Sequence, residues 1–310
     1  MIILRTVKHI SSLNIVASIL LFLTAILAAL IANSSLSPIY QDFLLQELHL
    51  RVGNFNLLSH GGHPLKMIEF INDCLMTVFF LAVGLEIKRE LLVGELSSFR
   101  KAALPFVAAC GGMVVPVLIY SLLVISGTPE TRGMAIPMAT DIAFSLGVLS
   151  LLGKRVPLSL KIFLTAFAVV DDIGGILVIA LFYSTDVAYG YLIVAAILYI
   201  FLYYMGKLGV TQKIFFLFFG IIIWYLFLQS GIHSTISGVI LAFVIPARPR
   251  LDAGKYIKRI RDIIGEFPAS KSDNIVLTNA QIATLKQVER ASDHVISPLQ
   301  SLEDNLHGAV

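Results

Sequence analysis

The chain has 310 residues, of which 57% are hydrophobic and 14% charged, and its mean hydropathy is +0.87 with a formal net charge of +3. A soluble globular domain is nearer half apolar and a quarter charged, so this composition excludes an ordinary soluble domain and predicts a protein of the lipid bilayer. The sequence has no basic stripe and no GxxxxGK[ST] phosphate loop, which argues against nucleic-acid binding and an ATP-driven pump. Cys74 and Cys110 form no disulfide framework or metal spacing, and no cofactor is indicated.

The first predicted element is an apolar run at Leu13–Ala32, behind a short basic N-terminus. Its length of about 20 residues exceeds that of a signal-peptide core, about 7–15 residues, so we interpret it as a retained first helix. The polar stretch that follows, Asn33–Lys66, contains Gly53-Asn54 and Gly61-Gly62. These dipeptides favour turns and predict a short hairpin on the membrane surface.

Membrane-spanning helices need about 20 apolar residues, and by this measure the sequence predicts about eight spans. Residues 1–246 would form the transmembrane domain and residues 247–310 a polar cytoplasmic tail or loop. Lys and Arg gather in the loops on one side of this topology, which predicts that both termini lie in the cytoplasm. The expected spans are Leu13–Ala32, Ile68–Ile87, Ala102–Ile125, Met134–Leu152, Leu158–Tyr183, Tyr189–Met205, Ile214–Leu228 and Ile232–Ile245.

Within the second predicted span, Asp73 and Glu86 are 13 positions apart, about 20 Å along a helix, and so lie near opposite ends. Glu86 and Glu90 share one face at a spacing of four residues. They form either a surface salt-bridge cluster or an entry funnel for ions. In the last span, His233 either titrates near neutrality as a pH-responsive group or makes ordinary hydrogen bonds.

The fourth predicted span contains Pro137, which removes a backbone donor and loosens the helix just before Thr140 and Asp141. Irregular backbone at membrane depth occurs where protein covers it or where it lines a wet cavity. Such a break could offer carbonyl, hydroxyl and carboxylate oxygens to a hard cation. A simple kink with a satisfied aspartate is the alternative.

The fifth predicted span carries two adjacent acids, Asp171 and Asp172. Each Asp at the centre of a spanning helix costs about 2.5–3.5 kcal/mol, so the pair indicates a functional site. Neighbouring residues on a helix point about 100° apart, so the two carboxylates are expected to have different partners. A purely structural pair would need nearby cations or donors. Gly174-Gly175 on the same helix would permit close helix packing.

Several phrases of the sequence resemble the NhaA family of sodium/proton antiporters: FFLAVGLEIKRELLVGEL, ATDIAFSLGVLSLLGKRVPLSLKIFLTAFAVVDDIGGILVIALFY and QSGIHSTISGVILAFVIP. The resemblance covers nearly all of residues 10–250. It implies an all-α polytopic fold with inverted repeats, of which this chain would be the N-terminal two-thirds, with one helix interrupted near Thr140-Asp141. It further implies that Asp172 is the main ligand of a transient Na⁺ with Asp171 beside it. By the same resemblance, Thr140 and Asp141 belong to the broken-helix crossing, Asp73 is the polar residue of the second helix, and Glu86 and Glu90 line the cytoplasmic funnel.

The implied function is secondary active transport, not enzyme catalysis. The family exchanges cytoplasmic Na⁺ or Li⁺ for external protons and contributes to pH and sodium homeostasis in the bacterial inner membrane. The expected partners are the lipid bilayer, Na⁺ and H⁺, with a homodimer as one candidate assembly and no nucleic acid.

The resemblance also implies about twelve helices, whereas the sequence predicts about eight. A second discontinuous helix, its embedded Lys and the partner repeat would then be missing, and we expect this polypeptide alone to be inactive or poorly folded. An inactive remnant, or a membrane protein that only binds partners, is the alternative to a transporter. An ion channel is disfavoured, because a single acidic site at the midplane suits capture and release better than conduction.

Overall fold

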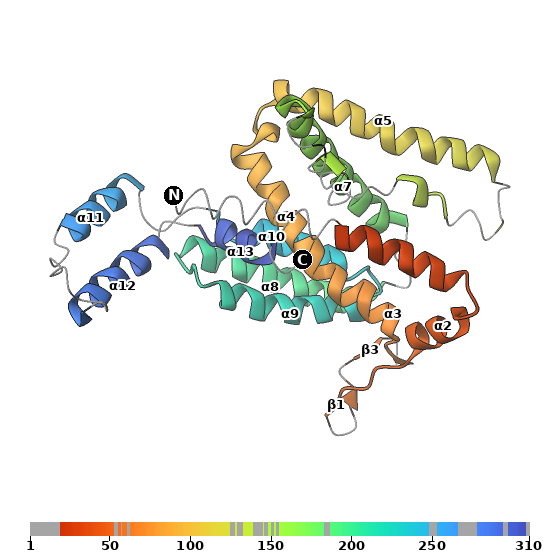
Figure 1. Cartoon of the computed structure of the whole chain (residues 1–310). Coiled ribbons are helices and arrows are strands. Elements are labelled where there is room, and N and C mark those ends of the chain that lie inside the picture. Colours follow the sequence, from red (N-terminus) through yellow and green to blue (C-terminus); the bar gives the residue numbers. More distant parts are fainter. Residues whose placement is uncertain are drawn as a thin grey trace.

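The computed structural model describes residues 19–52, 55–56, 58–60, 63–124, 128, 133–138, 145, 148–149, 152, 155–182, 187–247, 253–265, 278–293 and 297–307. This part of the chain is mainly helical, and long helices make up its body (Figure 1). Within these ranges, four helices are long and apolar enough to cross a membrane, and a bent pair near the N-terminus would be a fifth. The four are Met67–Val93, Arg100–Leu123, Tyr189–Lys207 and Lys213–Ser230. The predicted all-α membrane fold is confirmed.

The N-terminal region contains a helix at Ile19–Ala32 that bends by 108° into α2, Ser37–Leu45. Two small antiparallel hairpins follow. One hairpin was predicted in this stretch, and the structure contains two. In the first, β1 (Arg51–Val52) pairs with β2 (Phe55–Asn56). In the second, β3 (Ser59–His60) pairs with β4 (His63–Pro64). Gln229 Nε2 donates to the backbone oxygen of Ser59 at 2.5 Å and so fixes the second hairpin to the helical body.

The remaining elements run in chain order through the membrane domain into the C-terminal region. They are α3 (Met67–Phe70), the π-helical turn η1 (Ile71–Leu75), α4 (Met76–Val93), η2 (Glu95–Ser97), α5 (Phe99–Leu123), η4 (Ile136–Met138), α7 (Leu158–Phe182), α8 (Tyr189–Lys207), α9 (Lys213–Ser230), α10 (Thr235–Val244), α11 (Ala253–Gly265), α12 (Asn279–Asp293) and α13 (Pro298–His307).

The main apolar core lies among α4, α8, α9, α10 and α13. Its centre is formed by fully buried side chains such as Leu85, Leu202 and Phe216, which are each 0% exposed. Leu299 and Leu302 of α13 are buried in the same core. Residues 247–310, expected as a polar tail, therefore include a helix that packs into the membrane domain.

α10 packs closely along α4 because small residues line their contact. A Cβ atom on Gly84 would lie 2.8 Å from Ala242 Cβ, and one on Gly238 would lie 2.5 Å from the backbone oxygen of Thr77. Such small residues let helix backbones approach each other in membranes.

The C-terminal end of α10 is held by a lysine of α4. Lys88 Nζ donates to the backbone oxygens of Ala242 at 3.3 Å and Phe243 at 2.7 Å, and also to that of Ile245. The last carbonyls of a helix have no partners within it, and a cation there is favoured by the helix dipole. Lys88 supplies both the donors and the charge.

The expected eighth span, approximately Ile232–Ile245, contains a helix that is shorter than the predicted range. α10 begins only at Thr235 and has 10 residues. A helix of that size is about 15 Å long, half the thickness of the hydrocarbon core. Between α9 and α10, Gly231 has a φ of 79°, which places it in the left-handed region and ends α9.

α5 and α7 form a second packed pair (Figure 1). A Cβ on Gly174 would overlap the sulfur of Met113, so the predicted close approach is confirmed at Gly174, whereas a Cβ on Gly175 would meet nothing within 4 Å. A small cluster containing Val83, Ile87 and Val169 joins this pair to α4.

We expect Gly238→Ala to destabilise the protein, because the atom nearest the new methyl group would be a backbone oxygen of α4, which cannot move aside as a flexible side chain can. Overpacking of this kind costs about 1–3 kcal/mol, more than the helix propensity that alanine gains. The thermal midpoint of the detergent-solubilised protein measures the effect. Gly111→Ala, where a Cβ meets nothing within 4 Å, is the matched control and should not lower the midpoint. Equal midpoints for the two variants would contradict the packing described for α4 and α10.

Candidate functional site

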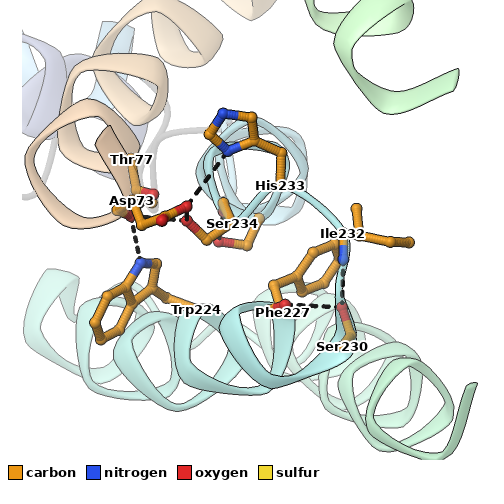
Figure 2. A network of polar contacts seen from close by, with 9 residues as sticks. Asp73, Thr77, Trp224, Phe227, Ser230, Ile232, His233 and Ser234 are labelled. Atoms are coloured by element: carbon orange, nitrogen blue, oxygen red, sulfur yellow. Dashed lines mark hydrogen bonds and ion pairs between the residues drawn. The ribbon is translucent and has the colours of Figure 1, made fainter. Parts of the chain in front are cut away.

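A network of polar contacts surrounds Asp73, in the π-helical turn that precedes α4 (Figure 2). In this turn the backbone N–H of Met76 bonds to the oxygen of Ile71, five residues earlier. A π-turn places one extra residue in a helix, and such turns are frequent at functional sites.

The backbone oxygen of Asp73 accepts hydrogen bonds from side chains of three different segments. Thr77 Oγ1 lies at 2.6 Å, Trp224 Nε1 of α9 at 2.6 Å and Ser234 Oγ at 2.8 Å. Ser234 Oγ is also 2.8 Å from Asp73 Oδ1, so its single proton serves one of these two oxygens at a time. One carbonyl therefore joins α4, α9 and the start of α10.

The Asp73 carboxylate also faces an imidazole. His233 Nδ1 lies 3.4 Å from Asp73 Oδ1, and the two side chains are 33% and 24% exposed. The contact is an ion pair when His233 is protonated and a polar contact when it is neutral. Figure 2 shows His233 and Ser234 reaching Asp73 from the same short connection between α9 and α10.

Local hydrogen bonds shape that connection. Ser230 Oγ donates to the oxygen of Phe227 at 2.8 Å and accepts from the N–H of Ile232 at 3.3 Å. Ser237 Oγ in turn donates to the oxygen of Ser234 at 2.6 Å. The break after Gly231 is thus an ordered turn, and it brings two polar residues to the aspartate.

The two adjacent aspartates lie midway along α7, on the helix pair with α5. Asp171 is 4% exposed, and the Oδ2 atom of Asp172 is buried. Gly174, three residues after Asp171, is where Met113 of α5 approaches most closely. Asp171 and the Oδ2 atom of Asp172 are therefore buried, and the role of the two acids as cation ligands stays a prediction.

Arg89, near the C-terminal end of α4, forms two salt bridges. Arg89 Nη2 lies 3.3 Å from Glu90 Oε1, and its Nη1 lies 3.0 Å from Glu303 Oε1 of α13. Glu90 thus takes part in a salt-bridge cluster, and Glu86 lies one turn earlier on the same helix.

Thr140 and Asp141 lie outside the described residues. Just before them, Pro137 lies in the 3₁₀ turn η4, which is irregular backbone of the kind predicted there. Within the described ranges no three His, Cys, Asp or Glu side chains gather as a metal-binding group. The contacts described here join Asp73 to His233, and Glu90 to Arg89 and Glu303, whereas Asp171 and Asp172 lie on another helix pair.

The sequence matches the family described as Na+/H+ antiporter 1 over residues 8–310. The chain belongs to this family. It is 74% identical over 310 residues to the Na(+)/H(+) antiporter NhaA of Bacteroides thetaiotaomicron, covering 100% of this chain and 71% of that protein. It is 75% identical over 310 residues to the antiporter NhaA of Bacteroides fragilis, with the same coverage. The antiporter NhaA of Phocaeicola vulgatus is 60% identical over 297 residues, covering 96% of this chain and 66% of that protein.

Several residues of these networks were missed by reasoning from the sequence, namely Lys88, Trp224, Ser234 and Glu303. Serine is common at helix contacts, so Ser234 carried no distinct signal. Trp224 is the only tryptophan in the chain and lies inside an apolar helix, where its N–H needs an acceptor. That requirement was the one usable signal for an oxygen acceptor nearby.

We expect Ser234→Ala to lower stability by about 1–3 kcal/mol, because it removes a buried donor and leaves the Asp73 oxygens with one partner fewer. The thermal midpoint measures stability, and the emission of Trp224, the sole tryptophan, reports any change at the same oxygen. Ser121→Ala is the matched control, because Ser121 donates to Val117 on an exposed stretch of α5. If both variants melted alike and left Trp224 emission unchanged, the network would not contribute to stability.

Proposed function

We propose that this chain acts as a Na⁺/H⁺ antiporter that exchanges cytoplasmic Na⁺, or Li⁺, for external protons and so contributes to pH and sodium homeostasis. The observation that carries the proposal is the buried acidic pair at Asp171 and Asp172, midway along a 25-residue helix. Ionisable residues inside a membrane are costly and mark ion pathways. Family membership and the printed names of the relatives support the same assignment.

The chemistry follows from the environment of a carboxylate removed from water. Such a group is unstable as an isolated charge, so it takes up either a proton or a cation. Asp172 is proposed as the main cation ligand with Asp171 beside it, and Thr140 and Asp141 as further oxygen ligands. Exchange results when this competition between Na⁺ and H⁺ occurs at a site that opens to each side of the membrane in turn.

The proposed setting is the bacterial inner membrane with both termini in the cytoplasm. The excess of Lys and Arg on one side of the predicted topology supports this orientation. The proposal includes secondary active transport without enzymatic turnover or a cofactor. It also allows a homodimer, which cross-linking in native membranes would test.

Asp73, Glu86, Glu90 and His233 are proposed as the residues that adjust transport to pH and lead ions to the site. The 3.4 Å contact between His233 Nδ1 and Asp73 Oδ1 supports the pH-responsive role, because it is an ion pair only when the imidazole is protonated. Glu90 beside Arg89 and Glu303 offers a second charged cluster at the other end of α4.

We expect Asp172→Asn to abolish Na⁺-dependent proton movement, because the amide cannot bind a proton or neutralise a cation. The assay uses inverted membrane vesicles from a host without its own antiporters, with the Bacteroides fragilis relative as positive control. Asp42→Asn, at an exposed position of α2, should leave the response unchanged. Exchange that survives Asp172→Asn would refute the site. No exchange by the unaltered chain, although it is present in the membrane, would favour a non-transporting protein.

We expect His233→Gln to shift Trp224 emission, because the variant removes the imidazole whose Nδ1 lies 3.4 Å from Asp73 Oδ1, and the backbone oxygen of Asp73 accepts the Trp224 N–H. Fluorescence of the two proteins at one fixed pH measures the shift. His49→Gln is the control, since His49 makes a contact of the same length, 3.4 Å, with Glu47 near the hairpins. Unchanged emission in His233→Gln would contradict the coupling of His233 to this network.

A further inference from the structure

The helix α11 has a distribution of residues that the transport site does not explain. Its sequence, AGKYIKRIRDIIG, contains four basic residues and one acidic residue. Along a helix with 3.6 residues per turn, the apolar residues at 256, 257, 260, 263 and 264 fall on one face. The charged residues at 255, 258, 259, 261 and 262 fall on the other face. A narrow apolar face flanked by basic residues is typical of helices that lie in a membrane interface.

Apolar side chains remain exposed on the hairpin that α11 forms with α12. The two helices pack against each other and lie apart from the main helical body (Figure 1). Ile264 of α11 is nevertheless 57% exposed, and Leu285 of α12 is 45% exposed. Lys258 and Arg261 of α11 are exposed as well. α12 therefore leaves part of the apolar surface uncovered.

The chain connection keeps α11 close to the membrane. α10 ends beside Lys88 of α4. Lys88 belongs to the charged last part of α4, which follows the apolar part of that helix. This end of α10 therefore lies at the membrane boundary. Ala247 precedes the first residue of α11, Ala253, by six positions. Six residues span at most about 22 Å, less than the thickness of the hydrocarbon core.

We propose that α11 lies on the membrane surface, with Ile264 turned into the lipid and Lys258 and Arg261 toward anionic phospholipid headgroups. The basic charge selects this occupant, because acidic lipids attract basic segments next to a spanning helix. Long basic side chains can reach the headgroups while their stems follow the apolar boundary. The inference is independent of the transport site and needs no ion exchange to be tested.

The test uses the full chain with Cys74→Ala and Cys110→Ala, reconstituted in vesicles with a spin label at Ile264→Cys or, as matched control, at Lys258→Cys. Collisions with oxygen report lipid exposure, and collisions with a nickel chelate report water exposure. In vesicles containing phosphatidylglycerol we expect the Ile264 label to collide mainly with oxygen and the Lys258 label to collide mainly with the nickel chelate. The thermal midpoint of each labelled protein verifies that the fold is retained.

Charge dependence gives the second measurement. Three changes should each lower the rate at which the Ile264 label collides with oxygen and raise its collision rate with the nickel chelate. They are neutral phosphatidylcholine vesicles, high salt, and the double change Lys258→Gln and Arg261→Gln. Equal nickel exposure of both labels in anionic vesicles would overturn the proposal. An Ile264 label shielded from both reagents would overturn it too, because a protein surface would then cover this face.

Discussion

The backbone oxygen of Asp73 is the point at which the central helices are joined. It accepts side-chain donors from Thr77, Trp224 and Ser234, which belong to α4, α9 and the start of α10. Two departures from regular helix geometry make this meeting possible, the π-turn at Ile71–Leu75 and the left-handed residue Gly231. In a low-dielectric interior these hydrogen bonds are stronger than in water, and irregular backbone there must be covered by protein. The irregular segments and the donors that satisfy them therefore depend on each other.

The acidic residues divide between two groups of packed helices. Asp73 and Glu90 belong to the group of α4, α8, α9, α10 and α13, which shares the main apolar core. Asp171 and Asp172 belong to α7, whose chief neighbour is α5. A small cluster around Val83, Ile87 and Val169 connects α4 with α7. α4 therefore contacts both groups of helices.

Hydropathy alone was sufficient to predict the helical membrane fold, because long apolar runs have few other solutions in lipid. It also located the acids of α7, since a charge inside such a run is conspicuous. Hydropathy failed where geometry depends on single residues. α10 begins at Thr235, three residues after the expected start of its span, and hydropathy does not signal that difference. The contacts of Asp73 with Ser234 and of Arg89 with Glu303 join residues far apart in the chain, so their pairing required the fold. The burial of α13 was hidden by its mixed polar sequence.

The lysine at the end of α10 has a mechanical consequence. Its ammonium group donates to three backbone oxygens at the end of α10, a helix that lies close to α4 because Gly84 and Gly238 line their contact. Sliding one helix past the other by a turn, about 5.4 Å, would break every one of those bonds and expose an uncompensated charge. We therefore expect α4 and α10 to move together as one rigid unit and not to slide past each other.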